Sequence, residues 1–129
     1  MIKLIASDID ETLIAKDQTV PKRNQEAIKK AIDKGIIVML ATGRGPYEVF
    51  DIPEKAGVIA EDRYLICCNG AVIMNVKSKE IVEVVDLDFS YAKAIFNYAY
   101  KNKLTFYLYT IDKKYGINLS DNTIIAEKH

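Results

Sequence analysis

An apolar segment at the start of the chain ends abruptly in two carboxylates, Asp8 and Asp10. Residues 1–6 are rich in Ile and Leu, which predicts a short buried strand. Side chains at the carboxyl end of a parallel strand project into the crevice where open α/β sheets bind ligands. Because side chains alternate along an extended chain, we expect both carboxylates on the same side, where their repulsion favours a metal ion beside them. The alternative is a strand followed by an acidic turn.

Helices and a second strand are predicted after these acids. Residues 22–34 combine an apolar stripe with a lysine-rich face, and Gly35 follows as a C-terminal stop. Residues 36–41 form an unbroken apolar run, which is typical of a parallel strand buried on both faces. The order strand, helix, strand predicts a right-handed βαβ unit. Residues 46–56 then predict another helix, which Pro53 breaks or kinks.

The second strand is followed directly by Thr42, Gly43 and Arg44, which we expect level with Asp8 on the neighbouring strand. A hydroxyl, backbone amides beside a glycine and a guanidinium are all suitable phosphate ligands. Glycine after a strand is common, so this loop alone indicates only a turn. Its coincidence with the two acids is what predicts a phosphate site.

A third apolar strand is predicted at residues 64–68 and ends in Asn69 and Gly70. Alone, this pair is a turn signal, but it adds a third polar strand end to the other two. The segments 71–75 and 80–87 predict a β-hairpin after it.

The chain changes character at Asp86, where we place a boundary between residues 1–85 and residues 86–129. Residues 90–102 predict an amphipathic helix with Ser90 as its N-cap. This second part therefore starts with a helix of its own.

An aromatic-rich strand is predicted next, at residues 104–111, followed by a turn at 112–116. The segments 117–119 and 123–126 are predicted to continue it as a small antiparallel sheet. We interpret the tyrosines here as packing and partner surface, because no basic stripe runs between them as in a platform for stacked bases.

The composition disfavours several classes of protein. Eighteen Lys and Arg balance eighteen Asp and Glu, so no overall field recruits nucleic acid or an anionic membrane. No apolar run approaches the roughly 18 residues of a membrane helix, and we expect a cytoplasmic protein. The adjacent Cys67 and Cys68 are interpreted as reduced core residues. The one histidine, His129, is the last residue of the sequence, which argues against catalytic triads and histidine-based zinc sites.

Three motifs together resemble the haloacid dehalogenase (HAD) superfamily, and most closely its Cof-like sugar-phosphate and nucleotide phosphatases. They are Asp8-Ile9-Asp10-Glu11-Thr12-Leu13, Ala41-Thr42-Gly43-Arg44 and Asn69-Gly70-Ala71. The resemblance extends from the first residue to about Tyr109. It implies an α/β fold, in which residues 1–85 form the N-terminal part of a Rossmann-like core, a parallel sheet with helices on both faces. Residues 86–129 would begin an α+β cap domain.

The resemblance also implies a chemistry. Asp8 would attack phosphorus and form an aspartyl-phosphate, and Asp10 would protonate the leaving alcohol and later deprotonate water. A Mg²⁺ ion would be held by the Asp8 carboxylate and the Asp10 main-chain carbonyl. The residues that bind the phosphate of the substrate would be Thr42, Gly43, Arg44 and Asn69.

Two departures from the family pattern bear on activity. Glu11 stands where the Cof-like subfamily usually has glycine. The family's later lysine and second acidic pair, on two more core strands, have no counterpart, because Lys113, Lys114 and Asp121 come at the wrong place in the order. We therefore expect the N-terminal portion of a Mg²⁺-dependent phosphatase for a small phosphorylated metabolite, sugar phosphate or nucleotide-like, with low activity alone.

The alternative hypothesis is a non-catalytic fragment or interaction module. A half-core would leave one edge of its sheet unpaired, and such an edge invites pairing with another chain. This predicts a homodimer, a domain swap or a partner that carries the missing half. An aspartate phosphoacceptor of the receiver type is disfavoured, because the later Asp and Lys at strand ends are absent.

Overall fold

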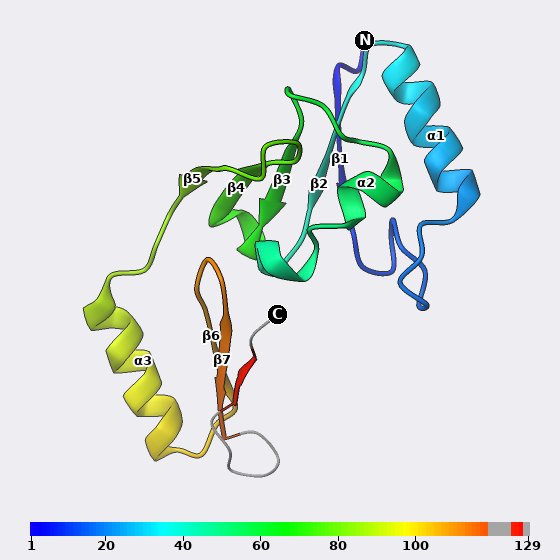
Figure 1. The fold of residues 1–129 in the computed structure, drawn as a ribbon. Coiled ribbons are helices and arrows are strands. Elements are labelled where there is room, and N and C mark those ends of the chain that lie inside the picture. The colour runs from blue at the N-terminus through cyan, green and yellow to red at the C-terminus, as the bar shows by residue number, and fades with distance from the viewer. Residues whose placement is uncertain (119–124, 128–129) are drawn as a thin grey trace. The chain divides into compact units, whose positions relative to one another are not determined.

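The computed structural model describes residues 1–118 and 125–127. The chain divides into two compact units, Met1–Val84 and Val85–His129, each with a sheet of its own (Figure 1). The division falls next to Asp86, where the sequence changes character. Whether the two units are a core and a cap domain stays a prediction. In the described part of the chain, no helix is long and apolar enough to cross a membrane.

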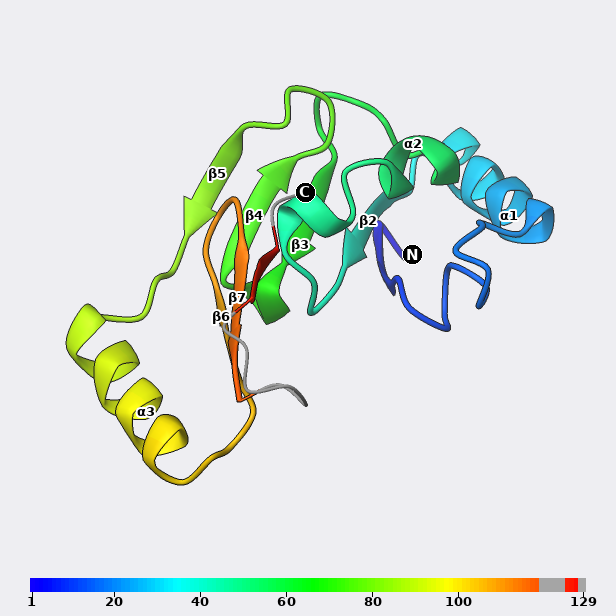
Figure 2. The same ribbon diagram turned by 60° about the horizontal axis from the view of Figure 1, so that its bottom comes forward.

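The first unit contains a five-stranded mixed sheet, which confirms the predicted α/β class. Its strands lie in chain order, so that β1 and β5 are the two edges, and Figure 2 shows β2 to β5 side by side. The first three strands are parallel, and the β3–β4 pair is antiparallel. The β4–β5 pair is also antiparallel, which confirms the predicted hairpin. The strands are β1 (Leu4–Asp8), β2 (Ile37–Ala41), β3 (Tyr64–Cys67), β4 (Val72–Asn75) and β5 (Ile81–Val84).

The register of the parallel strands places their carboxyl ends at one level. Asp8 of β1 lies opposite Ala41 of β2, and Ala41 lies opposite Ile66 of β3. The residues that follow each strand therefore meet at the same edge of the sheet, and Thr42, expected level with Asp8, lies one position beyond it.

Two helices accompany this sheet. Helix α1 (Lys22–Asp33) begins directly after Pro21, and its half-buried Ile28 and Ile32 pack against the core cluster of the sheet. Helix α2 (Ile52–Ala56) contacts α1. The single helix predicted at 46–56 is wrong, because a 3₁₀ turn over Pro46–Glu48 precedes α2 as a separate element. Pro53 lies in the first turn of α2, where proline is tolerated because its missing N–H would have no helical partner.

The prediction of a buried first strand is wrong. Leu4 and Ile5 of β1 remain 47% and 39% exposed, because β1 has a described neighbour, β2, on one side only. The prediction that β2 is buried on both faces is also wrong, since Val38 and Leu40 are buried whereas the intervening Met39 is half-buried. Apolar runs indicate strands, but their burial depends on how many layers and neighbours surround them.

The second unit contains helix α3 (Phe89–Lys101) and an antiparallel sheet in the order β6–β7–β8. Its strands are β6 (Phe106–Tyr109), β7 (Lys114–Ile117) and β8 (Ile125–Glu127). The predicted turn at 112–116 is too long, because β7 already starts at Lys114. Of the two short strands predicted after it, residues 119 and 123–124 lie outside the described residues.

The N-cap of α3 is also corrected. Asp88 holds the cap position, and its Oδ1 accepts a hydrogen bond from the backbone N–H of Ser90 at 2.8 Å. Ser90, the predicted cap, lies inside the helix instead. Both residue types are good caps, so the sequence could not separate them at a spacing of two.

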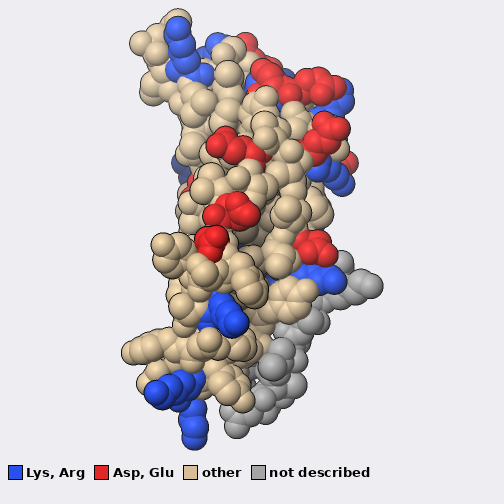
Figure 3. Space-filling view, turned by 90° about the vertical axis from the view of Figure 1, so that its left-hand side faces the viewer, with Lys and Arg blue, Asp and Glu red and all other residues tan. Residues whose placement is uncertain are grey.

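Charged side chains on the surface carry both signs. On the face that Figure 3 shows, both signs of charge occur and most of the surface is uncharged. This is what the balance of eighteen basic and eighteen acidic residues leads one to expect.

Candidate active site

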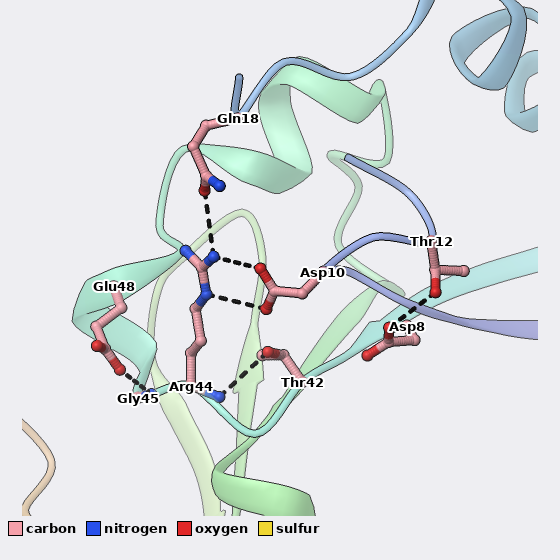
Figure 4. Close-up of polar contacts among 8 residues, drawn as sticks. All are labelled: Asp8, Asp10, Thr12, Gln18, Thr42, Arg44, Gly45 and Glu48. Atoms are coloured by element: carbon pink, nitrogen blue, oxygen red, sulfur yellow. Dashed lines mark hydrogen bonds and ion pairs between the residues drawn. The ribbon is translucent and has the colours of Figure 1, made fainter. Parts of the chain in front are cut away.

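The first predicted site residue, Asp8, is the last residue of β1 and its side chain is exposed. The chain turns sharply after it, because the carbonyl of the fully buried Ile9 accepts hydrogen bonds from the N–H groups of Leu13 and Ile14, both at 3.0 Å. This turn brings Thr12 back to Asp8, and the Thr12 hydroxyl donates to Oδ2 of Asp8 at 2.9 Å (Figure 4). Within residues 1–118 and 125–127, the other oxygen of Asp8, Oδ1, has no hydrogen-bond partner.

A pocket of about 310 Å³ opens beside Asp8 at the carboxyl ends of β1, β2 and β3. It joins four of the residues that the sequence predicts for nucleophile and phosphate binding. The lining residues are Asp8, Ala41, Thr42, Gly43, Ile66, Asn69 and Gly70. The residues around this space thus offer a carboxylate, a hydroxyl, a side-chain amide and the backbone of two glycines, which are groups of the kind that can bind phosphate.

Backbone hydrogen bonds fix the two loops of this pocket to each other. The N–H of Thr42 donates to the carbonyl of Ile66 at 2.8 Å, and the N–H of Asn69 donates to the carbonyl of Thr42 at 3.1 Å. Asn69 has a left-handed backbone, with φ of 55°. A Cβ atom at Gly43 would lie 3.1 Å from Oδ1 of Asn69, so the glycine permits this close approach.

The remaining predicted phosphate ligand, Arg44, contacts Asp10 instead of the pocket beside Asp8. Its Nε donates to Oδ2 of Asp10 at 3.0 Å, and its Nη2 forms a short ion pair with Oδ1 of the same carboxylate. Gln18 accepts a third hydrogen bond through Oε1, at 3.2 Å from Nη2 of Arg44. Figure 4 shows the guanidinium between Asp10 and Gln18. Arg44 does not line the pocket of Asp8.

The two acids of the first motif line different pockets. Asp10 lines a second space of about 430 Å³ together with Glu11, Lys16 and Gln18. The expectation that Asp8 and Asp10 share one side relied on an extended chain, but β1 ends at Asp8 and Asp10 belongs to the turn. Both pockets nevertheless adjoin the same short segment of chain.

The contacts of two residues at the site, Thr12 and Gln18, were not predicted from the sequence. Thr12 was part of the motif, and its spacing of four from Asp8 is a usable signal for the turn that joins them. Gln18 lies in a polar loop without any pattern, and its contact spans 26 positions to Arg44. No local feature of the sequence indicates that contact.

The residues at the site fit a magnesium ion that also binds a phosphate. No cluster of three or more His, Cys, Asp or Glu occurs in the part of the chain that the structure describes. Mg²⁺ usually needs less, because it retains water and binds one or two carboxylates together with substrate phosphate. Oδ1 of Asp8 and the main-chain carbonyl of Asp10 are both oxygens without a hydrogen-bond donor in the described residues, so both can serve as ligands.

Comparisons with known proteins find that the chain is similar to proteins named as phosphatases. The chain is 35% identical over 111 residues to the 5-amino-6-(5-phospho-D-ribitylamino)uracil phosphatase YwtE of Bacillus subtilis, which covers 86% of the chain and 37% of that protein. It is 30% identical over 121 residues to the phosphatase YcsE of the same organism, named for the same substrate, covering 94% of the chain and 47% of the relative. The chain thus spans less than half the length of these relatives.

Solved structures agree on the fold. A haloacid dehalogenase-like hydrolase from B. subtilis superposes with a TM-score of 0.76 at 28% identity, over 88% of this chain and 38% of that one. A sugar phosphatase of HAD subclass IIB superposes with a TM-score of 0.75 over 94% of this chain and 45% of that one, and at 20% identity this likeness concerns the fold alone. The profile of the haloacid dehalogenase-like hydrolases matches residues 5–129. The chain therefore belongs to the haloacid dehalogenase-like hydrolase family.

Proposed function

We propose that the chain carries the nucleophile and the first phosphate ligands of a Mg²⁺-dependent phosphatase that hydrolyses a small phosphomonoester. The observation that carries this proposal is the single pocket in which Asp8 meets Thr42, Gly43 and Asn69. Family membership supports it, because the named relatives are phosphatases.

The proposed reaction has two steps. The Asp8 carboxylate attacks phosphorus while Asp10 protonates the departing alcohol, and water then attacks the aspartyl-phosphate after giving a proton to Asp10. Thr42 and Asn69 hold the phosphoryl oxygens through a hydroxyl, an amide and the adjacent backbone N–H groups. Bound Mg²⁺ would supply positive charge that offsets the repulsion between Asp8 and the phosphate.

The substrate proposed is a phosphorylated sugar, polyol or nucleotide-like metabolite. The relatives YwtE and YcsE are named for a substrate with a phosphorylated ribityl chain, which supports this class. The cytoplasmic location remains a prediction from composition.

Two measurements test the proposal. Release of phosphate from p-nitrophenyl phosphate should depend on Mg²⁺ and be lost in Asp8→Asn. The rate should be low, because the later lysine and second acidic pair of the family pattern have no counterpart in this sequence. Each such electrostatic contact is worth about 2.7–4 kcal/mol by analogy with an oxyanion donor. In NMR titrations, inorganic phosphate with Mg²⁺ should shift the amide signals of Gly43 and Asn69. Absence of both turnover and these shifts would refute the proposal, whereas robust turnover would show that the chain carries a complete site.

The second candidate is an association module, favoured by the open edge of β1. Leu4 and Ile5 are exposed there, and an apolar pocket of about 260 Å³ lies between β1 and α1, lined among others by Ile5 and Ile28. We propose that a second copy of the chain pairs with this edge, because unpaired strand edges recruit other strands.

Light scattering at micromolar concentration tests this pairing. Leu4→Lys should convert the dimer into a monomer, since lysine on an edge disfavours strand addition. Val82→Lys on β5, the other edge of the sheet, is the matched control and should leave the dimer intact. A wild-type chain that is monomeric at this concentration would refute the module.

A further inference from the structure

We infer that Arg44 and Gln18 are positioning residues that orient the carboxylate of Asp10 for proton transfer, and that Arg44 is not a ligand of the phosphate. The inference rests on the proposed phosphatase function and specifies the roles of two residues at that site. It starts from the direction of the Arg44 guanidinium, which contacts Asp10 and Gln18 and stays outside the pocket of Asp8.

The contact between Arg44 and Asp10 is bidentate. Nε and Nη2 of the guanidinium donate to different oxygens of the carboxylate, Oδ2 and Oδ1. Two parallel N–H···O bonds fix the plane and the rotation of a carboxylate, which one bond or a lysine ammonium cannot do. The side chains of both residues are partly shielded, with 30% of Arg44 and 40% of Asp10 exposed, so water competes less than at an open surface.

Arg44 is itself held at its backbone. Its N–H donates to Oγ1 of Thr42 at 3.1 Å, and its carbonyl accepts from the N–H of Cys68 at 2.9 Å. The residue is thereby tied to the loops after β2 and β3, the same loops that line the phosphate pocket. Arg44 thus connects the loops that line the phosphate pocket to the carboxylate of Asp10 through hydrogen bonds.

Gln18 accepts a hydrogen bond from Nη2, the nitrogen of the guanidinium that also contacts Asp10 (Figure 4). It sits in a tight turn, where the N–H of Gln18 donates to the carbonyl of Ala15 at 2.9 Å and the N–H of Ala15 donates to the carbonyl of Thr19 at 2.8 Å. Its backbone is left-handed, with φ of 63°, a conformation that non-glycine residues adopt rarely. A turn that holds Gln18 in this way aims its Oε1 at Nη2 of Arg44.

The orientation matters in both steps of the proposed reaction. In the first step the Asp8–phosphorus bond forms as the bond from phosphorus to the leaving oxygen breaks, and the proton of Asp10 moves to that oxygen. In the second step the oxygen of water bonds to phosphorus, the Asp8–phosphorus bond breaks, and Asp10 takes a proton from the water. Proton transfer requires its donor within hydrogen-bond reach and correctly aimed, so loss of Arg44 should slow the step that needs the proton.

Leaving groups of different basicity test this role. Arg44→Ala should slow turnover of glycerol phosphate, whose alkoxide needs a proton, by roughly 100-fold more than turnover of p-nitrophenyl phosphate, whose phenolate leaves without one. Arg44→Lys should behave like Arg44→Ala, because charge without the bidentate geometry does not orient Asp10. Inhibition by inorganic phosphate should change little in both variants.

Asn69→Gly is the matched control in the phosphate pocket, because it removes the side-chain amide, suits the left-handed φ of 55° and leaves every described hydrogen bond of Arg44 in place. It should weaken inhibition by inorganic phosphate and slow both substrates to a similar degree. If Arg44→Ala instead reproduces the Asn69→Gly pattern, Arg44 is a phosphate ligand and the inference is wrong.

An NMR measurement tests the contact without turnover. The Nε–H signal of Arg44 should exchange with water more slowly than that of the exposed Arg23, and it should lose this protection in Asp10→Ala and part of it in Gln18→Ala. Lys16→Ala, in the same loop, should leave it unchanged. Equal exchange at Arg44 and Arg23 would overturn the inference. If the wild-type chain shows no turnover, that result counts against the proposed function, and the NMR measurement then tests only the contact of Arg44 with Asp10 and Gln18.

Discussion

Cys67 and Cys68 are neighbours in sequence but occupy different environments at the end of β3. Cys67 is fully buried in the core cluster, and burial raises its pKa from the ordinary 9.0 to about 12, with smaller contributions from Cys68 and Glu48. Cys68 is half-buried in a left-handed conformation, with φ of 51°, and burial also raises its pKa. Both are free thiols, as the sequence predicts. Their raised pKa values keep them protonated and poorly nucleophilic at neutral pH.

The pKa of Cys67 leads to a prediction for stability at alkaline pH. The unfolded chain releases this proton from about pH 9, whereas the folded chain retains it up to about pH 12, so the stabilisation is complete below pH 9 and is lost as the pH rises toward 12. Cys67→Ala should be less stable at neutral pH, because it leaves a cavity, but its stability should fall less steeply across this range. Urea unfolding at a series of pH values measures both slopes. Parallel slopes for wild type and variant would contradict the assignment.

Gly70 occupies a conformation that other residues adopt at a cost. Its φ is 97°, and a Cβ atom there would meet no neighbour within 4 Å, so backbone strain alone opposes substitution. Gly70→Ala should lower the free energy of unfolding by about 1–2 kcal/mol, measured by urea denaturation. Gly43→Ala is the control, because its Cβ would approach Asn69 without this strain. It should weaken phosphate binding more than stability, and the reverse order of effects would contradict these roles.

At the level of elements, the cap of α3 depends on Asp88. Oδ1 of Asp88 accepts from both the hydroxyl and the N–H of Ser90, and these two hydrogen bonds lower the pKa of Asp88. Asp88→Ala should increase amide hydrogen exchange in the first turn of α3 more than Ser90→Ala does, because the alanine at 88 removes the acceptor.

The acid dependence of the same cap can be measured independently. Since the folded pKa of Asp88 lies below the ordinary 3.8, its contribution is present above 3.8 and is lost as the pH falls through the folded value. Protection of the first turn should therefore decrease on acidification in the wild type and stay flat in Asp88→Asn. Equal acid sensitivity in both proteins would show that other groups control this helix end.

Elements with a long or regular apolar pattern were predicted well. Helix α1 starts at Lys22 as expected, because its stripe and the preceding proline are local signals. The burial of β1 was predicted wrongly, since the sequence of a strand does not indicate how many strands will pair with it. The same holds for the segment after Pro46, where two short helices replace one, because tertiary packing overrides a weak local pattern.

Some features of the candidate site could also be predicted from the sequence, and others could not. Thr42 and Asn69 were predicted beside Asp8, because each follows an apolar run and the ends of parallel strands meet. The pairing of Arg44 with Asp10 was not, since it joins residues 34 positions apart through side chains whose direction depends on the turns between them. Short-range sequence patterns can thus predict which residues lie at a site, but they do not predict which side chains contact each other there.

At the scale of the whole molecule, the two compact units have separate cores. The buried cluster around Leu65 consists of residues from the first unit alone. The aromatic contacts of Phe96 with Tyr100 and Phe106 belong to the second unit. Tyr47 and Tyr64 lie in the first unit and the remaining tyrosines in the second, so tyrosine fluorescence reports mainly on the second.

Separate cores predict separate responses to a core substitution. Leu65 is completely buried, and Leu65→Ala should cost the first unit about 2–5 kcal/mol through lost transfer energy and a cavity. In native-state hydrogen exchange, the amides of β2 and β3 should lose protection, while those of β6 and β7 should keep theirs. Ile59→Ala, at a side chain that is 43% exposed in the same unit, should change protection in neither sheet by more than about 0.5 kcal/mol. If Leu65→Ala instead lowers protection equally in both sheets, the two units unfold as one cooperative body. A substitution beside β3 can lower the protection of amides in β6 and β7 only if both units unfold in the same transition.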